Sequence, residues 1–328
     1  MSSTEKIAQD RIEYFGKQVQ QIRESLHKII VGQDEVIDQL LLCALTSSHA
    51  LLVGVPGLAK TLLVKALAGA FDWEYNRIQF TPDLMPADVT GYELLGRSTD
   101  NAGPEMVFRP GPVFANLVLA DEINRATPKT QSSLLEAMAE GHVTIGGVTH
   151  QLSSPFLVVA TQNPIEQEGT YPLPEAQLDR FMMEIHVGYP TPEQESQIVE
   201  KTTSSVLQMP SGGMTTKDFI ELQELVLAVP AAQTVIDKAV AICTQSRPKD
   251  ANASEMVRNY VAWGAGPRGS QNLVLAAKAR ALLLGRAAPT LEDLAAVAIP
   301  ILRHRIIVNH RAIGDGITAE QIIESLVK

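Results

Sequence analysis

The sequence contains few cysteines, few aromatic residues and no excess of basic residues. Its two cysteines, Cys43 and Cys243, lie far apart in apolar helical patterns and show no metal-ligand spacing. We therefore expect two reduced core thiols, and neither a structural disulfide nor a zinc site. Lys and Arg number 27 against 37 Asp and Glu, which gives a formal net charge of −10. This balance argues against a dedicated nucleic-acid binder, because neutralising phosphates requires clustered basic residues.

The sequence also lacks a long apolar run. No stretch approaches the roughly 18 residues of a membrane span, and the polar N-terminus MSSTEKIAQDRIEYF has no signal-peptide core. We therefore expect a cytoplasmic protein without a membrane span. With 328 residues, of which 45% are hydrophobic and 20% charged, the chain is typical of a globular protein of about two domains.

Short apolar runs alternate with helical patterns over the first half of the chain. The runs are His49–Val53, Arg77–Phe80, Leu117–Ala120, Phe156–Ala160 and Met183–Val187. Helical patterns such as Thr61–Phe71 and Thr127–Glu140 lie between them. Nearly continuous apolar strands separated by helices predict an α/β fold, in which helices cover both faces of a parallel sheet.

Three segments lie outside this alternation. Apolar residues spaced three or four apart over Ile7–Ile30 predict an amphipathic helix that packs on the main domain. His142–Leu152 reads as a hairpin whose two-residue turn is Gly146-Gly147. Tyr92–Phe114, rich in Gly and Pro, reads as an inserted loop with short strands around Met106–Phe108. The hairpin and the insertion either serve the fold or contact neighbours or substrate.

The composition changes after Tyr189-Pro190-Thr191-Pro192, where strand patterns end. The helical patterns that follow are Thr216–Ala228, Ala231–Arg247, Gly269–Leu284 and Thr290–Arg303, and Pro210–Met214 reads as a flexible link. We therefore predict an α/β core over residues 1–200 and a small all-helical lid domain over residues 201–328.

The first predicted strand leads directly into a glycine-rich loop that opens a helix. The loop reads Gly54-Val55-Pro56-Gly57-Leu58-Ala59-Lys60-Thr61, followed by Leu62. This is the Walker A pattern, whose backbone N–H groups and helix N-terminus bind phosphate oxygens. Lys60 is expected at the β- and γ-phosphates of ATP, and the Thr61 hydroxyl is expected to bind Mg²⁺. Ala59 replaces the usual Gly, and we expect it to need no positive φ at the first helical turn.

Polar residues follow two of the later strands. Asp121-Glu122 after Leu117–Ala120 fits the Walker B pattern, in which Asp121 holds Mg²⁺ through water and Glu122 is the general base. Without the loop, the same pair would indicate a capped helix start. Asn163, after the next strand, is predicted to orient the attacking water; the alternative is that it caps a turn before Pro164.

Two arginines are candidates for contacts with phosphate. Arg180 in Leu178-Asp179-Arg180-Phe181 lies too far along the fold to reach its own phosphates, so we predict an arginine finger supplied to a neighbouring subunit. The alternative is a surface arginine paired with Asp179 or Glu184. Arg268 stands at a predicted helix start, where the dipole disfavours a cation, which indicates a phosphate partner sensed from the lid. Loop solvation is the alternative for Arg268.

Taken together, these residues resemble the AAA+ ATPases and, more narrowly, the MoxR family. The narrower resemblance covers nearly the whole chain and rests on Val31-Gly32-Gln33, Gly54–Thr61, Asp121–Arg125 (DEINR), Pro128–Met138, Thr161–Gly169, Leu173–Phe181 and Leu302–Ile306 (LRHRI). It implies a P-loop ATPase core, a helical lid and a ring of subunits, expected to be a hexamer, with ATP and Mg²⁺ at subunit interfaces. It further implies that Val31, Gly32 and Gln33 line the adenine pocket.

The resemblance also implies partners. MoxR relatives act as chaperone-like ATPases that assemble or activate other proteins, often with von Willebrand factor A partners, which here would be separate chains. Two alternatives stay open. A DNA-acting motor would use the hairpin and the insertion, although His142–Leu152 carries few basic residues. A magnesium-chelatase-like motor subunit or nucleotide switch would show little turnover alone.

Overall fold

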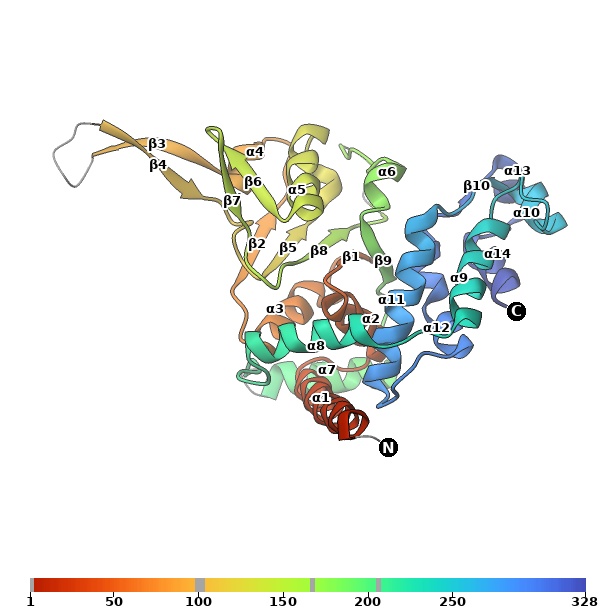
Figure 1. The fold of residues 1–328 in the computed structure, drawn as a ribbon. Coiled ribbons are helices and arrows are strands. Elements are labelled where there is room, and N and C mark those ends of the chain that lie inside the picture. Colours follow the sequence, from red (N-terminus) through yellow and green to blue (C-terminus); the bar gives the residue numbers. More distant parts are fainter. Residues whose placement is uncertain (1–2, 98–103, 166–168, 205–207) are drawn as a thin grey trace.

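The computed structural model describes residues 3–97, 104–165, 169–204 and 208–328. The centre of the predicted insertion, residues 98–103, lies outside the described residues, as do residues 166–168 of the Thr161–Gly169 segment. Figure 1 shows a sheet and its helices with a predominantly helical unit packed beside them.

A five-stranded parallel sheet in the order β2-β5-β8-β1-β9 forms the centre of the first half of the chain. The strands are β1 (His49–Val53), β2 (Tyr75–Gln79), β5 (Leu117–Asp121), β8 (Leu157–Gln162) and β9 (Phe181–His186). Each predicted run became a strand, with ends shifted by up to two residues. The prediction of a parallel α/β sheet is confirmed.

Alternate residues of these strands pack against different helices. Ala50 and Leu52 of β1 belong to the core under α1 (Ser3–His27), α2 (Asp34–Leu45) and α3 (Lys60–Ala70). Leu51 faces the opposite side, where α5 (Pro128–Glu140) contributes Leu134 and Leu135. Both faces of the central strands are therefore covered, which is why β1, β5 and β8 are almost continuously apolar, whereas the edge strand β2 has only Ile78 buried.

Helix α1 confirms the predicted amphipathic helix. Its apolar stripe is buried against the rest of the chain, as Ile12, Phe15, Val19, Ile22 and Leu26. The helices α6 (Glu175–Leu178) and α7 (Pro192–Ser204) flank β9, and α7 runs through the predicted domain boundary at residue 200. The predicted flexible link packs closely: Gly213 N–H donates to Ala70 O over 3.1 Å, and Met214 is buried.

Two hairpins project from one end of the sheet (Figure 1). The insertion contains the expected strand around Met106–Phe108, but its strands are longer than predicted: β3 (Gly91–Arg97) and β4 (Pro104–Pro110) pair over seven residues each, after the short helix α4 (Pro86–Thr90). Prolines at both ends of β4 are more typical of a loop, so the sequence does not indicate the full length of this strand. Proline is nevertheless tolerated at strand ends and edges. The second hairpin, β6 (His142–Ile145) and β7 (Val148–Gln151), agrees with the prediction.

The two hairpins contact each other. Gly146 and Gly147 both have positive φ, as a type I′ turn requires. The Glu93 carboxylate of β3 lies over this turn, so a Cβ at Gly146 would come within 2.3 Å of it. The rings of Phe108 and His150 stack with centroids 3.9 Å apart. The hairpins therefore form one unit, in which a side chain at Gly146 would have to displace the Glu93 carboxylate and adopt a strained positive φ.

The second half of the chain forms the lid. Its helices are α8 (Thr216–Ala228), α9 (Gln233–Gln245), α10 (Glu255–Tyr260), α11 (Pro267–Leu283), α12 (Leu291–Leu302), α13 (His310–Asp315) and α14 (Ala319–Val327). The expectation of an all-helical lid needs one correction, because β10 (Val261–Trp263) and β11 (Ile307–Val308) form a small antiparallel ribbon.

A buried carboxylate fixes the start of α12. The side chain of Asp293 is 0% exposed and receives two hydrogen bonds from Arg286, at 2.6 and 2.8 Å, and another from Arg280. Burial alone raises the pKa of Asp293, but the hydrogen bonds from Arg286, Thr290 and Arg280 outweigh it and lower that pKa to about 2. The cluster holds α11 and α12 together within the lid.

The two tryptophans lie in opposite environments. Trp73, after α3, packs against Phe71 and against Phe219 of α8, with centroids 4.8 and 4.7 Å apart. Trp263 in β10 is 72% exposed. No single helix of the described residues is long and apolar enough to cross a membrane; α8 and α9, bent by 88°, pass the length and composition criteria only as a pair.

Candidate active site

The loop between β1 and α3 forms the floor of a cavity at the carboxyl ends of the parallel strands. This cavity of about 400 Å³ is lined by Pro56–Leu62, by Asp121 and Glu122, and by Thr161–Asn163. A second cavity of about 350 Å³ shares Pro56–Ala59 and Leu62 with it. The predicted Walker A, Walker B and post-β8 residues therefore come together at the edge where ligands bind open α/β sheets.

Ala59 adopts a left-handed backbone conformation, with φ of 56° and ψ of 20°. The expectation that Ala59 needs no positive φ is therefore wrong. Ala59 is the residue before the first helical residue, and the chain must turn there to aim successive N–H groups into the cavity. An L-residue with a Cβ is strained in this region by about 1–2 kcal/mol, which explains why glycine is usual at this position.

Ala59→Gly is expected to raise the free energy of unfolding by up to about 1 kcal/mol, because glycine removes the strain at this φ. Urea unfolding followed by circular dichroism measures the change. Ala68→Gly within α3 is the matched control, and it should lower stability by about 1 kcal/mol, since glycine in a helix interior is unfavourable. Equal destabilisation by both variants would contradict a strained Ala59.

Lys60 begins α3 and bends back over the loop. Its ammonium donates to Gly54 O and, over 2.9 Å, to Val55 O. Burial lowers the pKa of Lys60, while the carboxylates of Asp121 and Glu122 act in the opposite direction. Thr61 follows on the first turn of α3 and lines the same cavity as Asp121. Lys60 is therefore a half-buried cation at the point where the helix N-terminus also attracts anions.

Asp121 ends β5 and is held on both carboxylate oxygens. Thr161 Oγ1 donates to Asp121 Oδ1 over 2.6 Å, and Arg77 Nη2 donates to Oδ2 over 2.7 Å. Thr161 Oγ1 also accepts the Glu122 N–H over 2.8 Å. One buried hydroxyl on β8 thus fixes both acidic residues of the Walker B pair.

Glu122 stands directly after β5 in a left-handed conformation, with φ of 56°. Gln79, at the end of β2, donates to Glu122 Oε2 over 3.0 Å, and Arg125 donates to the same oxygen over 3.2 Å. The strained backbone aims the carboxylate into the cavity, and these contacts orient it. Backbone strain of this kind concentrates at functional sites.

Asn163 is buried after β8 and lines the same cavity. Its Oδ1 accepts the Ile165 N–H over 3.1 Å, as the turn-capping alternative requires. This bond uses the side-chain oxygen only. The amide nitrogen can still act as a donor within the cavity, so the two interpretations are compatible.

The second cavity includes two of the three residues expected around adenine. Val31 and Gln33 line it beside Tyr189 and the start of α7. Gln33 Nε2 donates to Leu58 O over 3.3 Å, which joins this segment to the phosphate-binding loop. Gly32 has a φ of 66°, and a Cβ there would collide with Gln194. The two cavities thus lie side by side along the phosphate-binding loop, with Val31 and Gln33 at the second.

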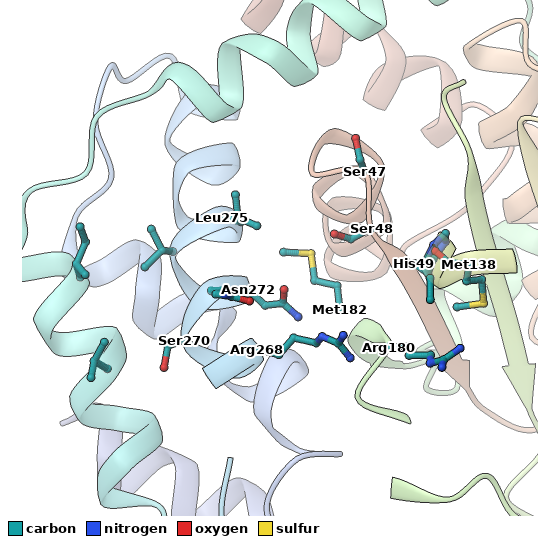
Figure 2. A pocket seen from close by; sticks show the side chains of 15 residues that line it. Ser47, Ser48, His49, Met138, Arg180, Met182, Arg268, Ser270, Asn272 and Leu275 are labelled. Atoms are coloured by element: carbon teal, nitrogen blue, oxygen red, sulfur yellow. Dashed lines mark hydrogen bonds between the residues drawn. The ribbon is translucent and has the colours of Figure 1, made fainter. Parts of the chain in front are cut away.

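Arg180 and Arg268 lie elsewhere, around a third cavity of about 670 Å³ between the lid and the core (Figure 2). Arg180 donates to Leu135 O, and Arg268 Nη1 lies 3.2 Å from Asp179 Oδ2. Neither arginine lines the cavities at the Walker A loop. Arg180 is therefore not paired with Asp179 or Glu184, and the structure groups Arg268 with Arg180 rather than with the phosphate-binding loop.

His49, at the start of β1, lines this third cavity and is buried, with 8% of its surface exposed. Its Nδ1 accepts the Val158 N–H over 3.0 Å and its Nε2 lies 3.2 Å from Met138 O, which requires the neutral ring. Burial lowers the pKa of His49 to about 4. Burial lowers the pKa of His304 in the same direction.

The unfolding free energy is therefore expected to fall on acidification from pH 6.5 towards pH 4. In this window the unfolded chain, with an ordinary histidine pKa of about 6.5, binds a proton that folded His49 does not. His49 alone accounts for a loss of about 2 kcal/mol at pH 5 and about 3 kcal/mol at pH 4. Denaturant unfolding at pH 7.5 and pH 5 measures it, with His49→Gln expected to flatten the profile. An unchanged profile in that variant would contradict this origin.

Pattern reading missed three residues of the site: Arg77, Gln79 and Thr161. Thr161 stands within the Thr161–Gly169 segment, directly before Gln162 and Asn163, and its position at a strand end is a signal for it. Arg77 and Gln79 come from β2, and their role depends on β2 lying beside β5, with Gln79 in register with Asp121. Strand order is set by tertiary packing, so the sequence held no comparable signal for them.

Comparisons with known proteins agree with this geometry. Residues 49–183 match the family described as "ATPase family associated with various cellular activities (AAA)", and residues 253–326 match its AAA lid domain. Chaperone MoxR1 of Mycobacterium tuberculosis is 42% identical over 92% of this chain and 78% of its own length. Protein MoxR of Paracoccus denitrificans is 34% identical over 86% of each chain.

A solved structure extends the likeness to the whole fold. A crystal structure of a protein from Cytophaga hutchinsonii superposes with a TM-score of 0.90 at 39% identity, covering 99% of this chain and 98% of that one. The core and the lid are thus shared along nearly the full length. The chain therefore belongs to the MoxR family of AAA ATPases, chaperone-like enzymes that bind and hydrolyse ATP.

Proposed function

We propose that this chain uses magnesium and ATP to remodel, assemble or activate other protein complexes, at an active site completed by a neighbouring subunit. The observation that carries the proposal is the separation of Arg180 and Arg268 from the phosphate-binding cavity of their own chain. Two arginines around an open cavity, away from their own phosphates, are placed to serve the phosphates of another copy.

Each Walker residue has a proposed role in hydrolysis. The Gly54–Leu62 loop binds the phosphates through backbone N–H groups, and Lys60 adds positive charge at the β- and γ-phosphates. Glu122 accepts a proton from the attacking water, and Asn163 orients that water. Val31, Gly32 and Gln33 contact the adenine, next to Tyr189.

The donor set also fits Mg²⁺. Thr61 offers a hydroxyl and Asp121 a carboxylate in one cavity, and hard oxygen ligands with phosphate oxygens are the usual environment of Mg²⁺. Asp121 is held in place by Thr161. An ion held by Thr61 and Asp121 would neutralise the charge that develops on the phosphate oxygens.

Supplying arginines to the next copy implies a head-to-tail arrangement of subunits. Such heterologous contacts close into a ring when the rotation allows it. We propose a ring of six subunits in the cytoplasm, in line with the family resemblance, with Arg180 as the arginine finger and Arg268 beside it.

The hairpin unit supports protein clients over nucleic acid. Leu95 and Met106 pair across β3 and β4 and are 71% and 54% exposed. The second hairpin, His142–Gln151, contains no Lys or Arg. Apolar exposed hairpins suit protein contacts, whereas DNA binding requires basic residues. A separate von Willebrand factor A protein is one proposed partner.

The ATPase rate per subunit, measured against protein concentration, tests the shared site. The rate should rise with concentration and level off when assembly is complete, as analytical ultracentrifugation at the same concentrations reports. A rate per subunit that stays flat from monomer to assembled particle would overturn the shared site. Strong salt-dependent stimulation by DNA would instead favour a DNA-acting motor.

A further inference from the structure

The segment that carries Arg180 is held by a buried arginine from the lid. Arg305 lies between α12 and β11, and its side chain is 2% exposed. Its Nε donates to Asp179 Oδ1 over 2.8 Å, and its Nη2 donates to Asp179 O over 3.0 Å and to Phe181 O over 2.7 Å. One guanidinium therefore forms hydrogen bonds with the residues immediately before and after Arg180.

A second lid arginine completes the contact. Arg268 Nη1 donates to Asp179 Oδ2 over 3.2 Å, so each oxygen of the Asp179 carboxylate accepts from a different lid arginine. Arg305 Nη1 adds a bond to Met182 O over 3.1 Å at the start of β9. The turn between α6 and β9 is thus attached to the lid by side chains from both α11 and the end of α12.

We propose that Arg305 is a positioning residue, which acts through Asp179 to hold Arg180 in the orientation needed at the active site of the neighbouring subunit. The inference rests on the proposed function, in which Arg180 serves that neighbour. It links the LRHRI and LDRF segments, which are more than 120 residues apart in sequence. Movement of the lid then moves Arg180.

The chemistry of the site requires arginine at this position. The planar fork presents donors in several fixed directions, which lets it reach a carboxylate and three carbonyl groups at once. A lysine ammonium keeps the charge but is a single point with three donors. Arg305→Lys therefore preserves the ion pair with Asp179 but loses some of the hydrogen bonds to the backbone carbonyl groups of the turn.

Arg305→Lys is expected to lower kcat for ATP by about 10–100-fold while leaving the KM for ATP unchanged, because misplacement of about 1 Å costs roughly 10²-fold. Asp179→Asn, which removes the charge that both lid arginines contact, should lower kcat in the same way. The matched control is Asp293→Asn in the other carboxylate–arginine cluster of the lid, which should lower the melting temperature without lowering kcat.

Mixed rings separate positioning from stability. A Lys60→Ala subunit cannot use ATP, but its Arg180 can still serve the active site of a neighbouring Arg305→Lys subunit. The ATPase rate of the mixture should therefore exceed the summed rates of the two separate variants several-fold. Arg180→Ala mixed with Lys60→Ala is the reference. If Lys60→Ala restores activity to Arg180→Ala but not to Arg305→Lys, the positioning role of Arg305 is overturned while the shared site stands. A wild-type kcat in Arg305→Lys would have the same meaning. Failure of the reference pair would overturn the shared site itself.

Discussion

Replacing Arg180 by alanine is expected to slow ATP hydrolysis in the assembled protein by about 10³–10⁵-fold, the size of effect associated with arginine fingers. The guanidinium stabilises charge that develops on the transferred phosphoryl group and contributes little to ground-state binding. Affinity for ATP should therefore stay close to that of wild type. Steady-state hydrolysis together with titration of a fluorescent ATP analogue measures both quantities.

The loss in Arg180→Ala must be separated from a loss of assembly. Arg11→Ala is the matched control, because Arg11 of α1 forms an exposed ion pair with Glu221 of the lid helix α8. Exposed ion pairs of this kind contribute about 0–1 kcal/mol to stability. Ultracentrifugation should give the same particle size for both variants. Full hydrolysis by an assembled Arg180→Ala protein would refute the finger role.

Glu122→Gln is expected to reduce kcat by about 10²–10⁴-fold, the usual contribution of a positioned general base. Glutamine has the same shape and can keep the contact with Gln79, but it cannot take a proton from water. ATP should bind and remain intact, so the variant should accumulate as an ATP-bound assembly. Single-turnover hydrolysis and the size of the particle with ATP provide the measurements.

Glu140→Gln, at the exposed end of α5, is the control for a change of one negative charge. Equal phosphate release by wild type and Glu122→Gln would mean that the chain is a nucleotide switch with little turnover of its own. Proteins that co-purify with the trapped assembly identify clients, and their absence would weaken the remodelling role.

The sheet and the phosphate-binding loop were predictable because their signals are local. The strands β1, β5 and β8 are apolar because both of their faces are covered, and the loop that leads to Lys60 and Thr61 follows the first strand directly. Asp121 and Asn163 could be placed beside them because carboxyl ends of parallel strands share one edge. The comparisons confirm the family to which these motifs point.

The sequence was less informative where a residue acts through a distant segment. The pairing of β2 with β5 places Gln79 and Arg77 at the site, and no local pattern encodes strand order. The position of the lid decides that Arg268 lies beside Asp179. Ala59 was misjudged for another reason: sequence shows that a methyl group replaces hydrogen, but not that the backbone must be left-handed there.

The placement of the two tryptophans makes the protein its own optical probe. Trp73 sits in an apolar cage that joins the core to the first lid helix, while Trp263 stands in solvent on the lid. Under ultraviolet excitation, a soluble quencher reaches only the second indole. Trp73 emission then reports changes in the packing between the core and the lid. Trp263 emission reports binding of a subunit or partner to the outer edge of the lid during the ATP cycle.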